Sequence, residues 1–104
     1  MEMDATEIPP HLLSIYKILK SAFPGDIQRE DYLSLISVLY SGFSQRNLAE
    51  LLSYSFNLDY YTVLNDVYLV GSPEHRPVAD AIERVKAHLI PHGYSEWLKE
   101  QGDS

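Results

Sequence analysis

Apolar residues recur along this chain three and four positions apart, which is the spacing of one face of a helix. The first such stripe follows Pro9-Pro10, a pair suited to a helix start, and ends before Pro24-Gly25. The second stripe begins near Asp31, which could cap a helix, and stops at Gly42. The apolar positions of the two stripes are Leu12, Ile15, Tyr16, Leu19 and Phe23, and then Tyr32, Leu35, Ile36 and Leu39. The pattern predicts two amphipathic helices.

Capping residues then bracket two further stripes. Ser44 offers an N-cap oxygen for a third helix, and Asn57 is a plausible terminator for it. Asp59 can cap a fourth helix, which Gly71-Ser72-Pro73 would close. The apolar sets are Leu48, Leu51, Leu52 and Phe56, and then Tyr60, Val63, Leu64, Val67 and Tyr68. The last set is β-branched and aromatic, so a strand is the alternative for that segment.

The fifth predicted helix starts near Arg76, because Pro77 cannot sit deep inside a helix, and it runs to about Ile90. Pro91 and Gly93 break it, and a last turn covers Ser95 to Glu100. Its apolar stripe is Val78, Ile82, Val85 and Leu89. We therefore expect an all-α fold, a compact bundle-like domain of about five amphipathic helices with a short C-terminal turn.

One domain is expected to cover residues 1–104, with an ordered core of about 8–100. Both ends hold polar residues with little to bury, so Met1 to Glu7 and Gln101 to Ser104 are predicted to fray. No internal repeat or interdomain linker interrupts the chain.

The residues that begin and end these helices, with some core positions, resemble those of a known family. The residues that carry the likeness are Ile8-Pro9-Pro10, Phe23-Pro24-Gly25, Asp31-Tyr32, and the ending Ile82, Val85 and Leu89 followed by Gly93-Tyr94. Over roughly Ile8 to Trp97 the chain resembles an actinobacterial family of small all-helical domains, domain of unknown function 3349. The resemblance implies a helical domain and supplies no activity, cofactor or catalytic residue.

The charge of the chain makes several partners unlikely. Eight Lys and Arg against fifteen Asp and Glu give a net charge of −7, which repels nucleic acid and anionic lipid. There is no Cys, so disulfides, thiolate nucleophiles and sulfur-based zinc sites are excluded. The start of the chain is acidic, and no apolar stretch approaches the ~18 residues of a membrane span. We expect a cytoplasmic protein that does not bind membranes.

The segment from Ser44 to Leu52 looks like the first helix of a repressor-type helix-turn-helix. However, Ser53 stands where that pattern prefers Gly, and no Lys or Arg occurs from Asn47 to His75. A recognition helix lies among phosphates, and cations supply much of the affinity for DNA. We therefore interpret the apolar positions of this helix as core. DNA binding is an alternative that requires the convergence of Arg29, Arg46, Arg76, Arg84 and Lys86.

His88 and His92 stand four apart, a spacing that can hold a metal, with Asp80 and Glu83 upstream. Pro91 lies between the two histidines and ends the helix, so we expect no metal site. The carboxylates are scattered, and neither a nucleophile elbow nor a phosphate-binding loop occurs. No catalytic residue or cofactor is predicted. A small hydrolase-type enzyme without a recognisable motif is the second alternative, with His88 or His92 in a pocket.

Tyrosine is the remaining anomaly of the composition. Of eight tyrosines, four lie within fifteen residues, at Tyr54, Tyr60, Tyr61 and Tyr68. A helical wheel leaves Tyr61, Asn65 and Tyr68 as a strip beside the core stripe. These residues are either boundary positions half covered by neighbouring helices or a surface for a protein partner. We predict a small non-enzymatic protein-interaction or regulatory domain that uses Tyr61, Asn65 and Tyr68, together with the single tryptophan, Trp97.

Overall fold

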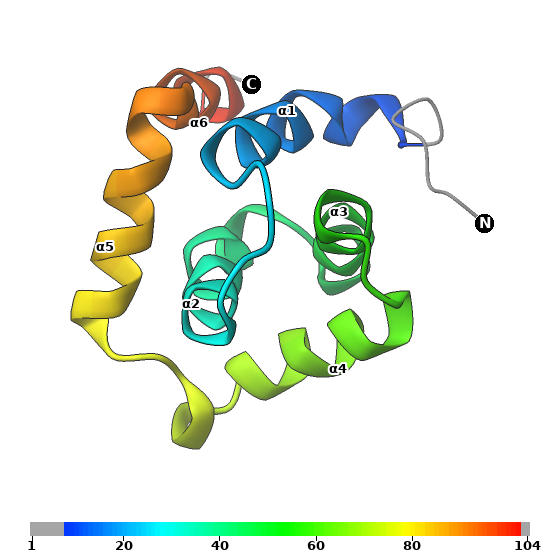
Figure 1. The fold of residues 1–104 in the computed structure, drawn as a ribbon, viewed down its shortest axis with the longest axis vertical. Coiled ribbons are helices and arrows are strands. Elements are labelled where there is room, and N and C mark those ends of the chain that lie inside the picture. The colour runs from blue at the N-terminus through cyan, green and yellow to red at the C-terminus, as the bar shows by residue number, and fades with distance from the viewer. Residues whose placement is uncertain (1–7, 103–104) are drawn as a thin grey trace.

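The computed structural model describes residues 8–102, and the regular secondary structure of this part is entirely helical (Figure 1). The α-helices are α1 (Leu13–Ala22), α2 (Arg29–Leu39), α3 (Gln45–Phe56), α4 (Tyr60–Val70), α5 (Ala79–Leu89) and α6 (Tyr94–Gly102). Short 3-10 turns precede or follow them: η2 (Pro10–Leu12), η3 (Tyr40–Gly42), η4 (Pro73–His75) and η5 (Ile90–His92). No strand occurs within residues 8–102. The all-α prediction is confirmed, and the β-branched fourth segment is a helix.

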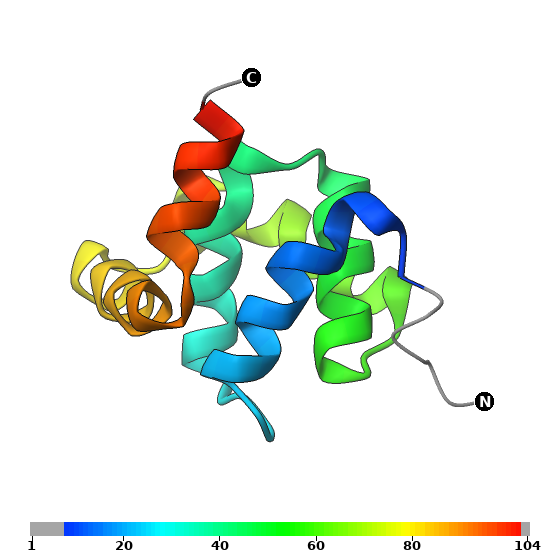
Figure 2. The same ribbon diagram turned by 90° about the horizontal axis from the view of Figure 1, so that it is seen from above.

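Helices α2 and α3 form the centre of the arrangement and are seen nearly end-on in Figure 1. Helix α1 crosses on one side of them and α4 on the opposite side, while α5 lies along the outside of α2. The view from above shows α1 running obliquely past α2 and α3, with α6 beside it (Figure 2). The most extensive helix contacts are those of α3 with α4 and of α2 with α5. The chain thus places α4 at an edge of the molecule.

The local signals that bracket α3 and α4 act as expected. The Ser44 hydroxyl oxygen accepts a hydrogen bond from the Asn47 amide at 3.1 Å, and the Asp59 carboxylate accepts one from the Thr62 amide at 3.0 Å. Both bonds satisfy amides that have no partner inside the helix. Asn57 ends α3 in the left-handed conformation, with φ of 54°. The predicted caps and terminator of these helices are confirmed.

The core is built from the predicted stripes. The largest fully buried side chains are Leu12, Ile15, Leu19, Leu35, Ile36, Leu39, Leu48, Leu51, Leu52, Val63, Val67 and Leu89. They come from η2 and from α1 to α5, and they belong to one cluster. Periodicity therefore identified the buried face of each of these helices correctly.

Two predicted helix starts are wrong. Helix α2 begins at Arg29, so Asp31 lies in its first turn, where it pairs with Arg84 at 2.7 Å instead of capping the helix. Helix α5 begins at Ala79, three residues after Arg76. Val78 precedes that helix in extended backbone and is 69% exposed, although it was predicted as core. Helical spacing does not apply to a residue outside the helix, so Val78 does not follow Val85 onto the buried face.

The C-terminal turn is also longer than predicted. It is a sixth helix, α6, which follows Gly93 in the left-handed region at φ 102°. Gln101 and Gly102, expected in a frayed tail, are part of α6, and Met1 to Glu7 lie outside the described residues. Buried Tyr94 and Trp97 anchor this helix on the core, which explains why it extends beyond one turn.

Candidate functional site

Helix α4 exposes the strip of Tyr61, Asn65 and Tyr68, which the sequence left open as either half-covered boundary positions or a free surface. Val63 and Val67 are fully buried, which turns the opposite face outward. On that face Tyr61 is 75% exposed and Tyr68 is 51% exposed, with exposed Asn65 between them. We call Tyr61, Asn65 and Tyr68 the tyrosine flank. Of the five large hydrophobic side chains exposed within residues 8–102, two lie on this one helix face.

Neighbouring groups hold and extend the tyrosine flank. The Tyr60 ring is half-buried and meets the Tyr61 ring edge-on, with centroids 5.2 Å apart. This contact supports the outward ring of Tyr61. Beside the flank runs a shallow groove of about 470 Å³, lined by Asn65, Asp66, Tyr68, Leu69, Ser72 and His75. Asn65 and Tyr68 of the flank therefore border a concave surface.

Trp97 does not join this surface. It is 7% exposed and belongs to the core. Its ring stacks on Phe43 at 5.4 Å between centroids and on Tyr94 at 6.0 Å. Because α6 packs back against α1, the tryptophan that was predicted to meet a partner is buried inside the chain.

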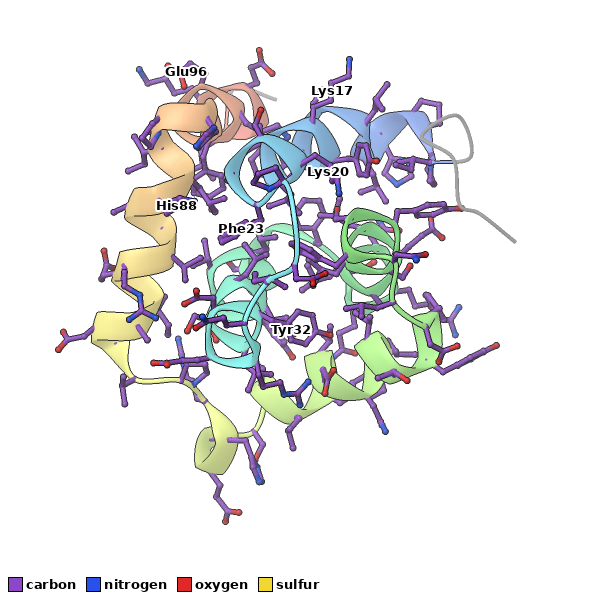
Figure 3. All side chains as sticks on the ribbon, viewed as in Figure 1. Lys17, Lys20, Phe23, Tyr32, His88 and Glu96 are labelled. Carbon is purple, nitrogen blue, oxygen red and sulfur yellow. The ribbon has the colours of Figure 1, made fainter. Side chains whose placement is uncertain are left out.

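Next to the tyrosine flank lies a charged group that sequence reasoning missed. Asp66, on α4, is only 8% exposed. Its carboxylate accepts hydrogen bonds from Arg29 Nη2 at 2.9 Å, from Arg29 Nη1 at 3.2 Å, and from the Tyr32 hydroxyl at 2.9 Å. Tyr32 extends from α2 into the region enclosed by α2, α3 and α4 (Figure 3). We call Arg29, Tyr32 and Asp66 the carboxylate cluster.

Within the carboxylate cluster, the charges of Arg29 and Asp66 are paired with each other. Burial, and then the hydrogen bond to Asp66, hold the pKa of Tyr32 well above its usual value, so this hydroxyl stays a donor. The hydrogen bond to Asp66 raises the pKa of Arg29, whose guanidinium also lies 5.5 Å from the centre of the Tyr32 ring. The only sequence signal for this arrangement was an acidic residue next to the apolar position Val67.

The cations named for DNA binding are spread over α2, α3, the segment before α5, and α5, which carries both Arg84 and Lys86. Arg29 pairs with Asp66, and Arg84 on α5 pairs with Asp31 at 2.7 Å and with Glu30 at 3.7 Å. Helix α4, which would be the recognition helix, has no Lys or Arg and exposes the tyrosine flank. The arginine charges that are paired in this way are partly neutralised before any phosphate arrives.

His88 and His92, which the sequence offered for a metal or catalytic site, contact other residues of the fold. His88 Nε2 lies 2.7 Å from the Ala22 carbonyl oxygen at the end of α1, and it points from α5 towards Phe23 (Figure 3). The rings of His88 and His92 are 5.7 Å apart. Within residues 8–102 no three His, Asp or Glu side chains are grouped to hold a metal ion. Over the same residues, no helix has the length and apolar character needed to span a bilayer.

The resemblance to domain of unknown function 3349 rests on helix-punctuating and core residues, and it stays a prediction. Comparison with protein-family models, with curated proteins and with solved structures found no match to this chain.

Proposed function

We propose that this chain is a small, cytoplasmic, non-enzymatic interaction domain that binds a protein partner through the tyrosine flank of α4. The observation that carries the proposal is the exposure of Tyr61 and Tyr68, at 75% and 51%, on one face of one helix. Asn65 between them adds an amide that can both donate and accept hydrogen bonds. The assignment to the cytoplasm rests on the sequence alone.

Exposed tyrosine suits this role for physical reasons. Its ring supplies a large apolar area at the entropic cost of two rotatable bonds, and its hydroxyl keeps a polar contact. Tyr61 and Tyr68 are seven residues apart, about two helical turns, which matches the i and i+7 spacing of anchors that meet a groove or a second helix. Truncation of such an anchor to Ala typically costs about 2 kcal/mol or more of binding free energy, which is roughly thirtyfold in affinity.

The charge around the flank favours a basic partner over DNA. From Asn47 to His75 the chain has no Lys or Arg, whereas Glu50, Asp59 and Glu74 are acidic. Such a surface attracts Lys and Arg side chains, which can also lie over tyrosine rings. It would repel the phosphates of a duplex.

The proposal is tested with the full chain as bait in extracts of its native cells, followed by calorimetry with the purified partner. Tyr61→Ala/Tyr68→Ala should weaken the partner's affinity at least tenfold. The matched control is Val78→Ala/Leu98→Ala, which truncates two exposed apolar side chains that do not belong to α4 and should bind like wild type. Equal affinity of all three proteins would refute the assignment, as would saturable capture of duplex DNA by the α4 surface.

A further inference from the structure

A cavity of about 410 Å³ lies where the turn before α2, the C-terminal end of α3 and the first turns of α4 meet. It is lined by Asp26, Ile27, Arg29, Tyr32, Phe56, Leu58, Thr62 and Asp66. This volume falls in the range of about 300–1,000 Å³ that is usual for small-molecule sites. The cavity is distinct from the shallow groove beside the tyrosine flank, although Asp66 borders both.

The walls of this cavity are largely apolar. Ile27, Phe56 and Leu58 are half-buried and pack against the core from three different segments. Phe56 is braced by an edge-on contact with Phe23, with ring centroids 6.1 Å apart. The walls can therefore cover an aliphatic chain and keep it from water.

The polar groups at the cavity differ in how well they are compensated. The charge of Arg29 is matched by the bidentate carboxylate of Asp66. The Thr62 hydroxyl donates to the Asp59 carboxylate at 3.2 Å. Lys20, in the adjoining depression, donates to the Ser55 carbonyl at 3.1 Å, near the negative end of the α3 dipole.

Asp26 is the exception. It is exposed, it borders both the cavity and the adjoining depression, and within residues 8–102 it has no hydrogen bond or ion pair. An anionic ligand would meet this carboxylate and an arginine already occupied by Asp66. A cationic ligand would meet a carboxylate that has no ion-pair partner within the described residues.

We propose that this cavity binds a primary ammonium group on an aliphatic chain, with the chain against Ile27, Phe56 and Leu58 and the ammonium beside Asp26. The same chemistry is offered by a free alkylamine and by the lysine side chain of a protein. The site goes beyond the proposed function, because it does not use the tyrosine flank. Binding here would leave Arg29, Tyr32 and Asp66 in their present contacts.

The test is a titration of the full chain with hexylamine, followed by amide NMR, with hexanol and hexanoate as matched neutral and anionic probes. Hexylamine should bind saturably, shift the amides of the lining residues and bind at least threefold more tightly than hexanoate. Asp26→Asn should weaken hexylamine binding by about two- to fivefold, as expected for one solvent-accessible charge pair. Glu74→Gln, which removes an exposed carboxylate elsewhere, should leave it unchanged.

Three outcomes would overturn the proposal: no saturable shift of the lining residues, hexanoate binding as tightly as hexylamine, or unchanged affinity in Asp26→Asn. Nα-acetyl-lysine methylamide separates the two sources. Binding at least as tight as that of hexylamine points to a lysine of a protein, and markedly weaker binding points to a free amine. Tyr61→Ala/Tyr68→Ala should keep hexylamine binding, so the failure of this site and that of the tyrosine flank are distinguishable.

Discussion

Replacement of Asp66 by Ala tests whether the carboxylate cluster holds α4 against α2. The substitution removes the acceptor of three hydrogen bonds, two from Arg29 and one from the Tyr32 hydroxyl. Tyr32 is 4% exposed, so its hydroxyl loses its partner where water has little access. The Arg29 side chain is 60% exposed and can be hydrated again.

These exposures set the expected loss of stability. A buried donor without an acceptor costs about 1–3 kcal/mol, and this contribution dominates. A solvent-exposed ion pair contributes only about 0–1 kcal/mol, which is the share assigned to Arg29. Because Ala has a higher helix propensity than Asp, it offsets about 0.5 kcal/mol of this loss. We therefore expect Asp66→Ala to lower the free energy of unfolding by about 2 kcal/mol.

Urea unfolding measures this quantity. Trp97 is the only tryptophan and is buried between Phe43 and Tyr94, so its fluorescence reports the loss of the core. Far-ultraviolet circular dichroism follows the helices independently, and coincident transitions would support a two-state analysis. Tyr32→Phe and the double variant with Asp66→Ala complete a double-mutant cycle.

The cycle is the critical part of the experiment. In the Tyr32→Phe background there is no hydroxyl to leave unsatisfied, so Asp66→Ala should cost less than about 1 kcal/mol. If Asp66→Ala costs the same with and without the tyrosine hydroxyl, the explanation from the buried donor is refuted. A loss below about 0.5 kcal/mol in the wild-type background would show that the cluster does not stabilise the α2–α4 contact.

Other predictions concern pH and backbone positions. Burial raises the pKa of Tyr32 and Tyr94 in the folded chain, so their contribution to stability is constant at lower pH. Above a pH of about 10 the free energy of unfolding should fall by up to ~1.4 kcal/mol per pH unit for each of the two tyrosines. Urea unfolding at several pH values should show that Tyr32→Phe removes the part of this fall that is due to Tyr32. Gly71→Ala should cost about 1–3 kcal/mol in urea, less in a Tyr40→Phe background, because its Cβ would lie 2.6 Å from the Tyr40 hydroxyl. Asn57→Ala should cost about 1 kcal/mol in thermal melts, and Asn57→Gly should not, because φ is 54°.

Local signals were sufficient for most of the helices. Ser44 and Asp59 cap their own first turns, and Asn57 turns the chain left-handed at the end of α3. These effects act within about four residues, so they can be recognised in a short window of sequence. The same holds for the stripe of Leu48, Leu51 and Leu52, whose spacing matches the face that is buried.

Contacts between distant segments explain what the sequence did not reveal. Trp97 was predicted for a surface and is buried against Phe43, whereas Val78 was predicted as core and is exposed. Helical spacing placed Tyr61 on the flank of α4, beside the core positions. Whether a neighbouring helix covers its side chain depended on the tertiary packing, which leaves it exposed. Asp66 meets Arg29 across 37 positions of the chain. Helix periodicity fixes which residues share a face, and only the packing of separate helices determines whether that face meets water or another side chain.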